Sequence, residues 1–304
     1  MQIECRENYE IKTHTSFKIG GVVSKAWFPK TQQELVYLLK ELKNYILLGN
    51  CSNILFSTNG YKGNIILTTQ MKHFEINGTR VIADCGVKGP MLSQKACEAS
   101  LSGFEFMIGF PGSIGGEIYM NASCHGQCIS DCLVRCCLFD KEKKEVIYKD
   151  KSEMEFDYRK SILQKGKYIL LGAEFELKKS KQEDIKALLD RNLSFRKDVQ
   201  PSLAHPNAGS VFKNPENDSA GRLLDKAGVK EFESENVMVW NKHANFIVNK
   251  GNATSEDVLE LMEKMFTAVK ENYRIELQPE IIFIGDKTKK EEKICKILYQ
   301  KTQK

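Results

Sequence analysis

The sequence lacks the long apolar runs that cross a bilayer. No stretch approaches the ~20 consecutive apolar residues that a membrane-spanning helix needs. The first ten residues, MQIECRENYE, carry charges where a secretory signal peptide would have an apolar core. Proline is scarce, with 7 in 304 residues, whereas 41% of the residues are hydrophobic. This composition excludes bulk disorder and fibrous repeats, and we expect a folded cytoplasmic protein without a membrane partner.

An excess of positive charge is also absent from most of the chain. The sequence has 45 basic and 40 acidic residues, but residues 287–304 alone contain seven lysines and two glutamates. The remaining 38 residues of each sign offer no broad basic face, so we expect no nucleic-acid partner. We expect the tail to form a solvated helix with Ile294, Ile297 and Leu298 along one side; contact with nucleic acid or a membrane is the alternative.

Ten cysteines in a chain without an export signal indicate reduced thiols. Five of them cluster: Cys124, Cys128, Cys132, Cys136 and Cys137. On a helix, the four-residue spacing would align thiols for a metal. However, residues 128–139 are more typical of a turn followed by β-structure, and the spacing matches no usual zinc or iron–sulfur pattern. We therefore predict no metal site and interpret the cysteines as small hydrophobic residues.

Hydrophobic periodicity and turn residues predict a mixture of helices and strands. The expected helices cover 31–43, with a capping box of Thr31 and Glu34, 89 to about 103, 182–198, 220–227 and 254–272. The expected strands cover 45–48, 64–69, a hairpin over 74–85 that turns at Asn77-Gly78, several runs up to 177, and 274–284. Because helices and strands do not alternate regularly, the pattern indicates an α+β fold.

Three glycine-bearing segments lie within the first 125 residues. They are TSFKIGG at 15–21, GNCSN at 49–53, and GFPGSIGG at 109–116, which leads into MNA at 120–122. Glycine lets the backbone approach a ligand, while Ser and Asn add short donors for phosphate oxygens. Neither a Walker A motif nor G-x-G-x-x-G is present. Each segment alone could be an ordinary turn, but together they favour a large ligand that bears a diphosphate.

A second set of polar motifs follows. It comprises FDYRKS at 156–161, HPNAGSVFKNP at 205–215, KHANFIVN at 242–249, and QPE at 278–280. Read locally, Arg159 could be a surface ion pair, Ser210 a turn hydroxyl, Glu280 a solvated charge and His243 a structural histidine. The pattern alone does not bring these segments together.

The two sets of motifs, in this order, resemble the UDP-N-acetylenolpyruvoylglucosamine reductase (MurB) family over about Thr13 to Gly285. The compact stretch from Arg159 to Ser210 is similar to the shorter of its two subtypes. The resemblance implies a two-subdomain FAD-binding module of the vanillyl-alcohol oxidase (PCMH) type, over 1–72 and 73–199. It also implies a C-terminal α+β substrate-binding domain over 200–304, which includes the basic tail.

The resemblance implies FAD as cofactor, and NADPH and UDP-N-acetylglucosamine enolpyruvate as partners. NADPH would reduce FAD, and reduced flavin would pass hydride to the enolpyruvyl methylene carbon. The product, UDP-N-acetylmuramate, is a cytoplasmic precursor of peptidoglycan, and thus serves cell-wall synthesis, cell shape and division. Preference between NADPH and NADH, and the oligomeric state, stay open at this point.

Residue roles transfer from the same resemblance. Ser210 matches the proton donor, Arg159 the residue that binds the carboxylate and developing enolate, and Glu280 the third catalytic position. Because a carboxylate would repel that anion, we hypothesise that Glu280 carries a proton or acts through a neutral donor. The matched FAD-binding positions are Lys18, Gly20, Gly21, Gly49, Asn50, Cys51, Ser52, Asn53, Gly112, Ser113, Gly115, Gly116, Asn121 and Ala122. The expected substrate-binding positions are Tyr158, Lys213, Asn214, His243 and Asn245.

The chain departs from the family pattern at three places. Lys18 stands where Arg is common, Cys51 stands at a usual glycine, and Ser123-Cys124-His125 replaces a more typical small-small-aromatic run. Cys51 would crowd the FAD phosphates if its position needs a positive φ.

The motifs leave two other functions as alternatives: oxidation of a small alcohol or sugar on the same FAD fold, and non-catalytic binding of a nucleotide sugar. Ser210, Arg159 and Glu280 together argue against both.

Overall fold

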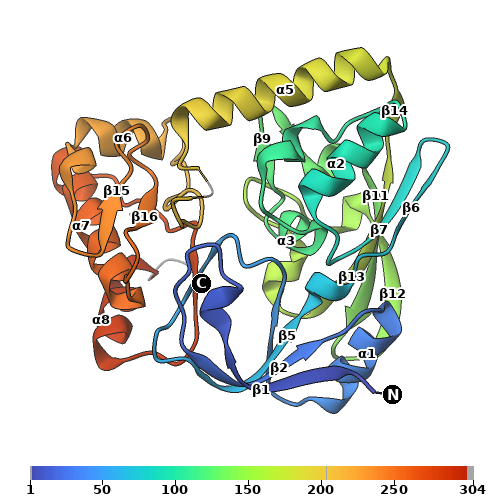
Figure 1. Cartoon of the computed structure of the whole chain (residues 1–304), viewed down its shortest axis with the longest axis horizontal. Coiled ribbons are helices and arrows are strands. Elements are labelled where there is room, and N and C mark those ends of the chain that lie inside the picture. Colours follow the sequence, from blue (N-terminus) through green and yellow to red (C-terminus); the bar gives the residue numbers. More distant parts are fainter. Residues whose placement is uncertain (1, 203, 300–304) are drawn as a thin grey trace. The chain divides into compact units, whose positions relative to one another are not determined.

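The computed structural model describes residues 2–202 and 204–299, and these fall into two compact units (Figure 1). The first unit contains residues 2–6, 25–50 and 64–196 of the described chain. The second contains residues 7–24, 51–63, 197–202 and 204–299. Each unit has its own hydrophobic core. The mixed helix and strand content confirms the α+β class, while the domain limits at residues 72 and 199 stay predictions.

A five-stranded antiparallel sheet forms the centre of the first unit. Its strands, in spatial order, are β12 (Glu145–Asp150), β11 (Leu133–Asp140), β13 (Tyr168–Glu176), β7 (Arg80–Asp84) and β6 (Phe74–Asn77). The predicted β6–β7 hairpin is confirmed, with Gly78 at φ 61° in its turn. Phe175 is fully buried and meets the ring of Phe104 edge-on at 5.2 Å. Such aromatic pairs make the apolar face of the sheet part of a close-packed core.

The helices of the first unit begin where the sequence places capping residues. The hydroxyl of Thr31 accepts the Glu34 N–H at the start of α1 (Gln32–Glu41), so the predicted cap is confirmed. The other bond of the predicted capping box, from the Thr31 N–H to the Glu34 carboxylate, is wrong, because this carboxylate accepts the Lys30 N–H at 2.6 Å instead. α2 (Gly89–Glu98) begins at Gly89-Pro90 as predicted but ends earlier, since Leu101–Ser102 (β8) pairs with Lys178–Lys179 (β14).

The cysteine-rich stretch contains a short helix that the sequence pattern does not predict. The hairpin of β9 (Ser123–Cys124) and β10 (Gln127–Cys128) leads into α4 (Ile129–Cys132), and β11 follows at once. The Asp131 carboxylate accepts the Cys128 N–H at 2.8 Å and so stabilises this single turn. The turn-then-strand prediction is therefore right for 133–140 and wrong for 129–132.

A four-stranded sheet contains the predicted β–α–β start. Its order is β1 (Glu4–Glu10), β2 (Val22–Phe28), β5 (Tyr61–Leu67) and β3 (Tyr45–Leu48). β3 and β5 pair in parallel, from Tyr45 opposite Asn64 to Leu48 opposite Leu67. Parallel neighbours need a crossover connection, and residues 49–60 connect β3 to β5, whereas α1 lies between β2 and β3. Two further helices are α3 (Ile114–Tyr119), which contacts the five-stranded sheet, and α5 (Gln182–Val199), which is predicted from its polar pattern.

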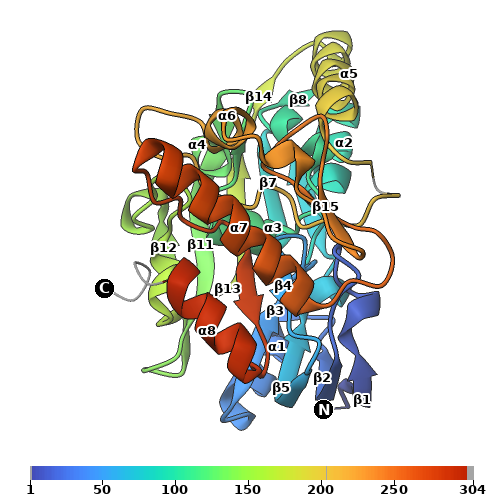
Figure 2. The same ribbon diagram turned by 90° about the vertical axis from the view of Figure 1, so that its left-hand side faces the viewer.

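The second unit is built mainly from helices: α6 (Ala220–Lys226), α7 (Ser255–Tyr273) and α8 (Lys289–Leu298). A capping box of Thr254 and Asp257 starts α7, and its predicted apolar stripe is buried. Figure 2 shows α7 and α8 side by side. On α8, Ile294 and Leu298 are buried and Ile297 is 36% exposed. The last five residues of the basic tail lie outside the described residues.

Two short strand pairs complete the second unit. β15 (Val237–Val239) pairs with β16 (Ile247–Asn249), and β4 (Ile54–Phe56) pairs in parallel with β17 (Ile282–Ile284). The predicted strand 274–284 is wrong over 274–281, because only 282–284 is a regular strand. Pro279 has no N–H to donate to a ladder, and the residues around it instead form single bonds with residues 211–213.

Within 2–202 and 204–299, no helix is long and apolar enough to span a membrane. None of the ten cysteines, all of which lie in the described residues, forms a disulfide, and six of them are buried. Within these same residues, no group of three or more His, Cys, Asp or Glu side chains could hold a metal ion. Burial raises the pKa of the Cys85 and Cys136 thiols to about 12. These thiols behave as small core side chains rather than as nucleophiles.

This assignment predicts the order of thiol alkylation in the native protein. At about pH 8, iodoacetamide should label exposed Cys5 and leave Cys85 and Cys136 unlabelled, because a buried thiol with a raised pKa offers almost no thiolate. Mass spectrometry of the digested protein measures the labelling, and alkylation in denaturant serves as the control. Equal labelling of Cys85 and Cys5 in the folded protein would contradict the assignment.

Candidate active site

Ser210 lies in the second unit, on an extended segment that adjoins the segment carrying Glu280. The Glu280 N–H donates to the Val211 carbonyl at 2.8 Å, and the Lys213 N–H donates to the Gln278 carbonyl at 2.8 Å. Phe212 and Pro279 form an antiparallel bridge between these two bonds. The structure thus places two of the three predicted catalytic residues on neighbouring backbone segments, although 70 positions separate them in the sequence.

Asn245 supports the same segment from another side. Its Oδ1 accepts the Phe212 N–H at 2.9 Å, and its Nδ2 donates to the Phe212 carbonyl at 2.8 Å. The Asn245 carbonyl also accepts the Val211 N–H at 2.9 Å. Asn245 is only 3% exposed, so its amide replaces water for buried backbone groups. Its observed role is to hold the segment, and a contact with substrate stays a prediction.

The approach to Ser210 is a turn stabilised by Asn207. The Asn207 Oδ1 accepts the Gly209 N–H at 3.0 Å, and Gly209 has φ 76°. The Asn207 carbonyl accepts the Ser16 hydroxyl at 2.7 Å, which ties this turn to the first glycine-bearing segment. Ser210 itself is half-buried, and among the described residues its hydroxyl forms no hydrogen bond. The hydroxyl can therefore point at a ligand without first breaking a bond within the protein.

Part of the GNCSN segment also contacts this region of the second unit. The Cys51 carbonyl accepts the Ser16 N–H at 3.3 Å, and Asn53 Nδ2 donates to the Glu280 carbonyl at 3.0 Å. Cys51 has φ 51°, the positive value at which its side chain is expected to crowd the FAD phosphates. The thiol is 3% exposed, and burial raises its pKa to about 12. Cys51 is thus a neutral, inward-facing residue in a backbone conformation that costs about 1 kcal/mol.

The glycines of the TSFKIGG segment allow neighbouring parts of the chain to pack closely against its backbone. A Cβ on Gly21 would overlap with the Thr58 carbonyl oxygen, so close packing of two backbone segments requires glycine there. Lys18 is exposed with φ 55°, and its Nζ donates to the Thr13 carbonyl at 3.1 Å. Contact of Lys18, Gly20, Gly21 and Ser52 with FAD stays a prediction.

Arg159 lies in the first unit, at the tip of a tight turn. Asp157 and Lys160 form the bridge that closes the turn, and Arg159 has φ 54°. Its Nη1 donates to the Ser123 hydroxyl at 2.7 Å, and its guanidinium lies over the Tyr158 ring, 5.0 Å from the centroid. These contacts orient the guanidinium while Tyr158 stays 47% exposed. Ser123 is a partner of Arg159 that the sequence motifs did not identify.

Hydrogen bonds join the Arg159 turn to the MNA segment within the first unit. The Asn121 Nδ2 donates to the Asp157 carbonyl at 3.1 Å, and the Ser161 hydroxyl donates to the Tyr119 carbonyl at 2.8 Å. The Ala122 N–H donates to the Glu117 carbonyl at 2.8 Å. The predicted FAD-binding positions Asn121 and Ala122 therefore lie beside the predicted carboxylate-binding Arg159.

The GFPGSIGG segment lies against Gly49 and Asn50 in the first unit. A Cβ on Gly49 would overlap with the Ser113 hydroxyl, and the Asn50 side chain donates to the Pro111 carbonyl. The N–H groups of Ile114 and Gly115 donate to the carbonyls of residues 87 and 85, each at 2.8 Å. Those two amides are committed to the protein itself. The predicted phosphate contacts of this segment therefore fall to other groups, such as the Ser113 side chain and the amides around Gly112 and Gly116, and these contacts stay predictions.

Buried polar atoms of this segment test whether it fits FAD. Ser113 is 2% exposed and Asn121 is 8% exposed, yet Ser113 Oγ and Asn121 Oδ1 have no hydrogen-bond partner among the described residues. Buried polar groups are normally satisfied, so unpaired ones beside a glycine-rich segment suit a polar ligand. Hydroxyl and amide groups suit the phosphates and ring edges of FAD, and the residues present therefore fit this cofactor.

Glu117 is a buried residue of the same segment that the motif analysis missed. It is 3% exposed, and burial raises the pKa of its carboxyl group to about 8. Neither carboxyl oxygen has a hydrogen-bond partner among the residues described. A charged residue directly after two glycines, inside the otherwise uncharged run IGGEIY, is the sequence signal that could have identified it.

The remaining substrate-binding candidates lie near Ser210 in sequence or in space. The His243 Nδ1 accepts the Asn245 N–H at 3.2 Å, and burial lowers the His243 pKa, so the ring is neutral at pH 7. Asn214 Oδ1 accepts the Ala220 N–H at 3.0 Å at the start of α6. Lys213 is half-buried. The second unit therefore brings Lys213, Asn214, His243 and Asn245 to one region, and their contacts with substrate stay predictions.

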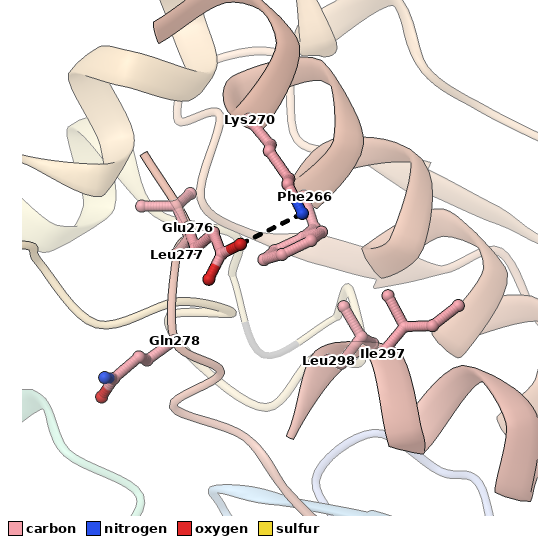
Figure 3. A pocket seen from close by; sticks show the side chains of 7 residues that line it. All are labelled: Phe266, Lys270, Glu276, Leu277, Gln278, Ile297 and Leu298. Atoms are coloured by element: carbon pink, nitrogen blue, oxygen red, sulfur yellow. Dashed lines mark ion pairs between the residues drawn. The ribbon is translucent and has the colours of Figure 1, made fainter. Parts of the chain in front are cut away.

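A separate pocket of about 290 Å³ lies between α7, α8 and residues 276–278 (Figure 3). It is lined by Phe266, Lys270, Glu276, Leu277, Gln278, Ile297 and Leu298. Lys270 Nζ and the Glu276 carboxylate form an ion pair at 3.0 Å at its edge. None of the predicted catalytic residues lines this pocket, so we do not assign it to the active site.

Family models match the two functional parts of the chain. Residues 23–143 match an FAD binding domain, and residues 200–284 match the C-terminal domain of UDP-N-acetylenolpyruvoylglucosamine reductase. An FAD-binding domain followed by this reductase domain defines the chain as a flavin-dependent oxidoreductase.

Curated relatives and a solved structure specify the family. The chain is 41% identical over 289 residues to UDP-N-acetylenolpyruvoylglucosamine reductase of Caldicellulosiruptor bescii, covering 93% of this chain and 92% of the relative. It is 38% identical over 284 residues to that of Caldanaerobacter subterraneus subsp. tengcongensis, covering 92% and 93%. The Thermus caldophilus MurB crystal structure matches with a TM-score of 0.80 at 32% identity, covering 93% of this chain and 99% of that one. The chain belongs to the UDP-N-acetylenolpyruvoylglucosamine reductase (MurB) family.

The structural role of Asn245 predicts a large loss of stability on truncation. Asn245→Ala should lower the free energy of unfolding by about 3 kcal/mol, because it leaves the Phe212 N–H and carbonyl buried without partners. Asn272→Ala is the matched control: its exposed amide donates only to the Ala268 carbonyl, and the loss should stay below about 0.5 kcal/mol. Urea denaturation followed by fluorescence measures both. Equal losses in the two variants would contradict the role.

Proposed function

We propose that this chain reduces UDP-N-acetylglucosamine enolpyruvate to UDP-N-acetylmuramate in the cytoplasm, with NADPH as reductant. The observation that carries the proposal is the hydrogen-bonded pairing of the Ser210 and Glu280 segments, in a chain of this family. FAD, held by residues such as Ser113 and Asn121, would supply the hydride chemistry between NADPH and the methylene carbon of the enolpyruvyl group. The residues of the chain then have to bind the substrate, stabilise the resulting anion and protonate it.

Arg159 binds the enolpyruvyl carboxylate in this proposal. Hydride addition to the methylene carbon leaves negative charge on the adjacent carbon and its carboxylate. A guanidinium can donate two parallel hydrogen bonds to a carboxylate and does not lose its own charge. The contacts with Ser123 and the Tyr158 ring support a preset orientation, which reduces the reorganisation needed as charge develops.

Ser210 supplies the proton to that adjacent carbon. A free serine hydroxyl is a weak acid, so the anion must form within hydrogen-bond reach of it. The Ala208-Gly209 approach leaves little side-chain bulk next to the hydroxyl, and the bonds to Val211 and Phe212 keep the following residues fixed. The proton moves from the Ser210 oxygen to carbon, and Ser210 is reprotonated before the next cycle.

Glu280 is the third group in the proposal. Its N–H donates to Val211 and its carbonyl accepts from Asn53, so its backbone is fixed beside the proton donor. Its side chain is half-buried. Because a charged carboxylate would repel the substrate anion, Glu280 acts as a neutral hydrogen-bond donor or through another neutral donor. Oxidation of a small alcohol would produce no carbanion and would give neither Ser210 nor Glu280 this task.

The first test separates the two half-reactions. Ser210→Ala should keep NADPH-dependent bleaching of the flavin but slow reoxidation by UDP-N-acetylglucosamine enolpyruvate at least about 100-fold, because only the second half-reaction needs a proton on carbon. Anaerobic stopped-flow absorbance measures both rates. Ser24→Ala, at an exposed serine, is the control and should match the parent in both. Reoxidation of Ser210→Ala at the parental rate would remove Ser210 from the role of proton donor.

The second test concerns Arg159. Arg159→Lys keeps the positive charge but loses the bidentate geometry, so substrate-dependent reoxidation should fall about 10- to 100-fold, while FAD content and reduction by NADPH stay close to parental. The flavin absorbance of the purified protein and the same stopped-flow traces measure these effects. The exposed Arg222, which pairs with Asp218, provides a control substitution to Lys. Unchanged reoxidation in Arg159→Lys would show that Arg159 does not bind the substrate.

A further inference from the structure

Glu117 is the buried acidic group that the proposed reaction does not use. It lies on α3, and its carboxyl group packs against the backbone of two glycines. A Cβ on Gly89 would overlap with Oε1, and one on Gly112 would lie 3.1 Å from it. The carboxyl group therefore sits directly against the start of α2 and the GFPGSIGG segment, both within the first unit.

The environment of Glu117 favours the neutral acid. Desolvation by burial raises the pKa of this carboxyl to about 8, and no charged neighbour contributes to the shift. The charged groups on the elements around α3 are Lys95 and Glu98 on α2, Arg80 and Asp84 on β7, Asp131 on α4, Glu174 and Glu176 on β13, and Lys165 before β13; Arg80 pairs with Glu174 and Glu176. Lys88 precedes α2. None of them offsets a negative charge on Glu117, so the carboxyl group keeps its proton at neutral pH.

A second buried glutamate shows what is unusual about Glu117. Glu105 is 2% exposed, but its Oε2 accepts the Gly103 N–H at 2.8 Å. Glu117 has no such donor among the described residues, although both of its oxygens are buried. The neighbouring Ser113 Oγ and Asn121 Oδ1 are unpaired as well. Four of the unpaired buried oxygens of the described chain thus lie between residues 113 and 121, while Ser93 Oγ and Glu105 Oε1 lie outside this stretch.

We propose that Glu117 is a proton-linked control on FAD retention: the neutral acid permits the FAD diphosphate to bind at the adjacent glycine-rich segment, and ionisation of Glu117 expels it. This inference rests on the proposed function, because it takes this segment to be the diphosphate site. A carboxylate and a diphosphate that share a low-dielectric region repel each other, whereas a carboxylic acid can stay beside it or donate to it. Glu117 acts here as a positioning residue and takes no part in the hydride or proton transfer.

The sign of the pH dependence follows from linkage. If a bound diphosphate disfavours the Glu117 carboxylate, then the FAD complex binds a proton more tightly than the FAD-free protein does. FAD affinity is then constant below the pKa of about 8 and falls above it. One titrating group limits the fall to about tenfold per pH unit. Binding of FAD above that pKa must also take up as much as one proton.

The experiment starts from the purified holoenzyme and needs no turnover. FAD released on dilution is measured by its fluorescence between about pH 6.5 and about pH 9, which gives the dissociation constant. For the parent, the constant should rise about tenfold over this range. Glu117→Gln cannot ionise, and its constant should change less than about twofold. Glu105→Gln, the matched buried control, should retain the parental pH dependence.

A second measurement does not depend on any variant. Calorimetry of FAD rebinding to the parent in buffers of different ionisation enthalpy should show proton uptake at about pH 9 and none at about pH 6.5. A parental dissociation constant that stays flat with pH, or a Glu117→Gln protein with the parental pH dependence, would overturn the proposal. Absence of FAD from the parent at every pH would instead refute the proposed function.

Discussion

Two hydrogen bonds from Asn245 to the backbone of Phe212 fix the segment on which the proposed chemistry of the second unit depends. A buried backbone N–H or carbonyl without a partner is costly, so the segment stays where these bonds are made. On its other side, the same segment bonds to the backbone around Glu280. The hydroxyl of Ser210 is thereby presented from a rigid support, although Ser210 itself lies outside any regular strand.

Backbone conformations with positive φ occur in several of the predicted ligand-binding segments. Of the eleven non-glycine residues with positive φ in the described chain, four fall in segments that the sequence assigns to ligands: Lys18, Cys51, Asn121 and Arg159. Each costs about 1 kcal/mol relative to a relaxed backbone, and such residues persist only when the surrounding contacts enforce them. Arg159 illustrates how: the bridge between Asp157 and Lys160 sets the turn, and Ser123 then holds the guanidinium. At Arg159, the strained backbone conformation is thus held by contacts that also orient the side chain.

The sequence predicts those parts of the fold that depend on local signals. The Thr31 cap, the Asn77-Gly78 hairpin and the α7 stripe are each encoded within a few residues. The strand expected at 274–281 fails because its partners are single backbone groups at 211–213, which no local pattern reveals. For the site, motifs identify Ser210 and Glu280, but only long-range bonds bring them together. For Glu117, the run IGGEIY marks an unusual charge, but its packing against Gly89 and Gly112 is a long-range feature that only the structure shows.

In the proposed function, Glu117 and Glu280 each lie next to an anionic ligand, and a negatively charged carboxylate would repel it. A carboxylate next to the phosphates of FAD or next to a substrate carbanion opposes binding of that anion, so each group must be neutral when the anion is present. Burial achieves this for Glu117 before any ligand arrives. Glu280 is only half-buried and borders the Ser210 segment, so desolvation by the protein alone is weaker there. In the proposed function, the bound substrate therefore has to exclude the remaining water around Glu280, whereas burial by the protein does this at Glu117.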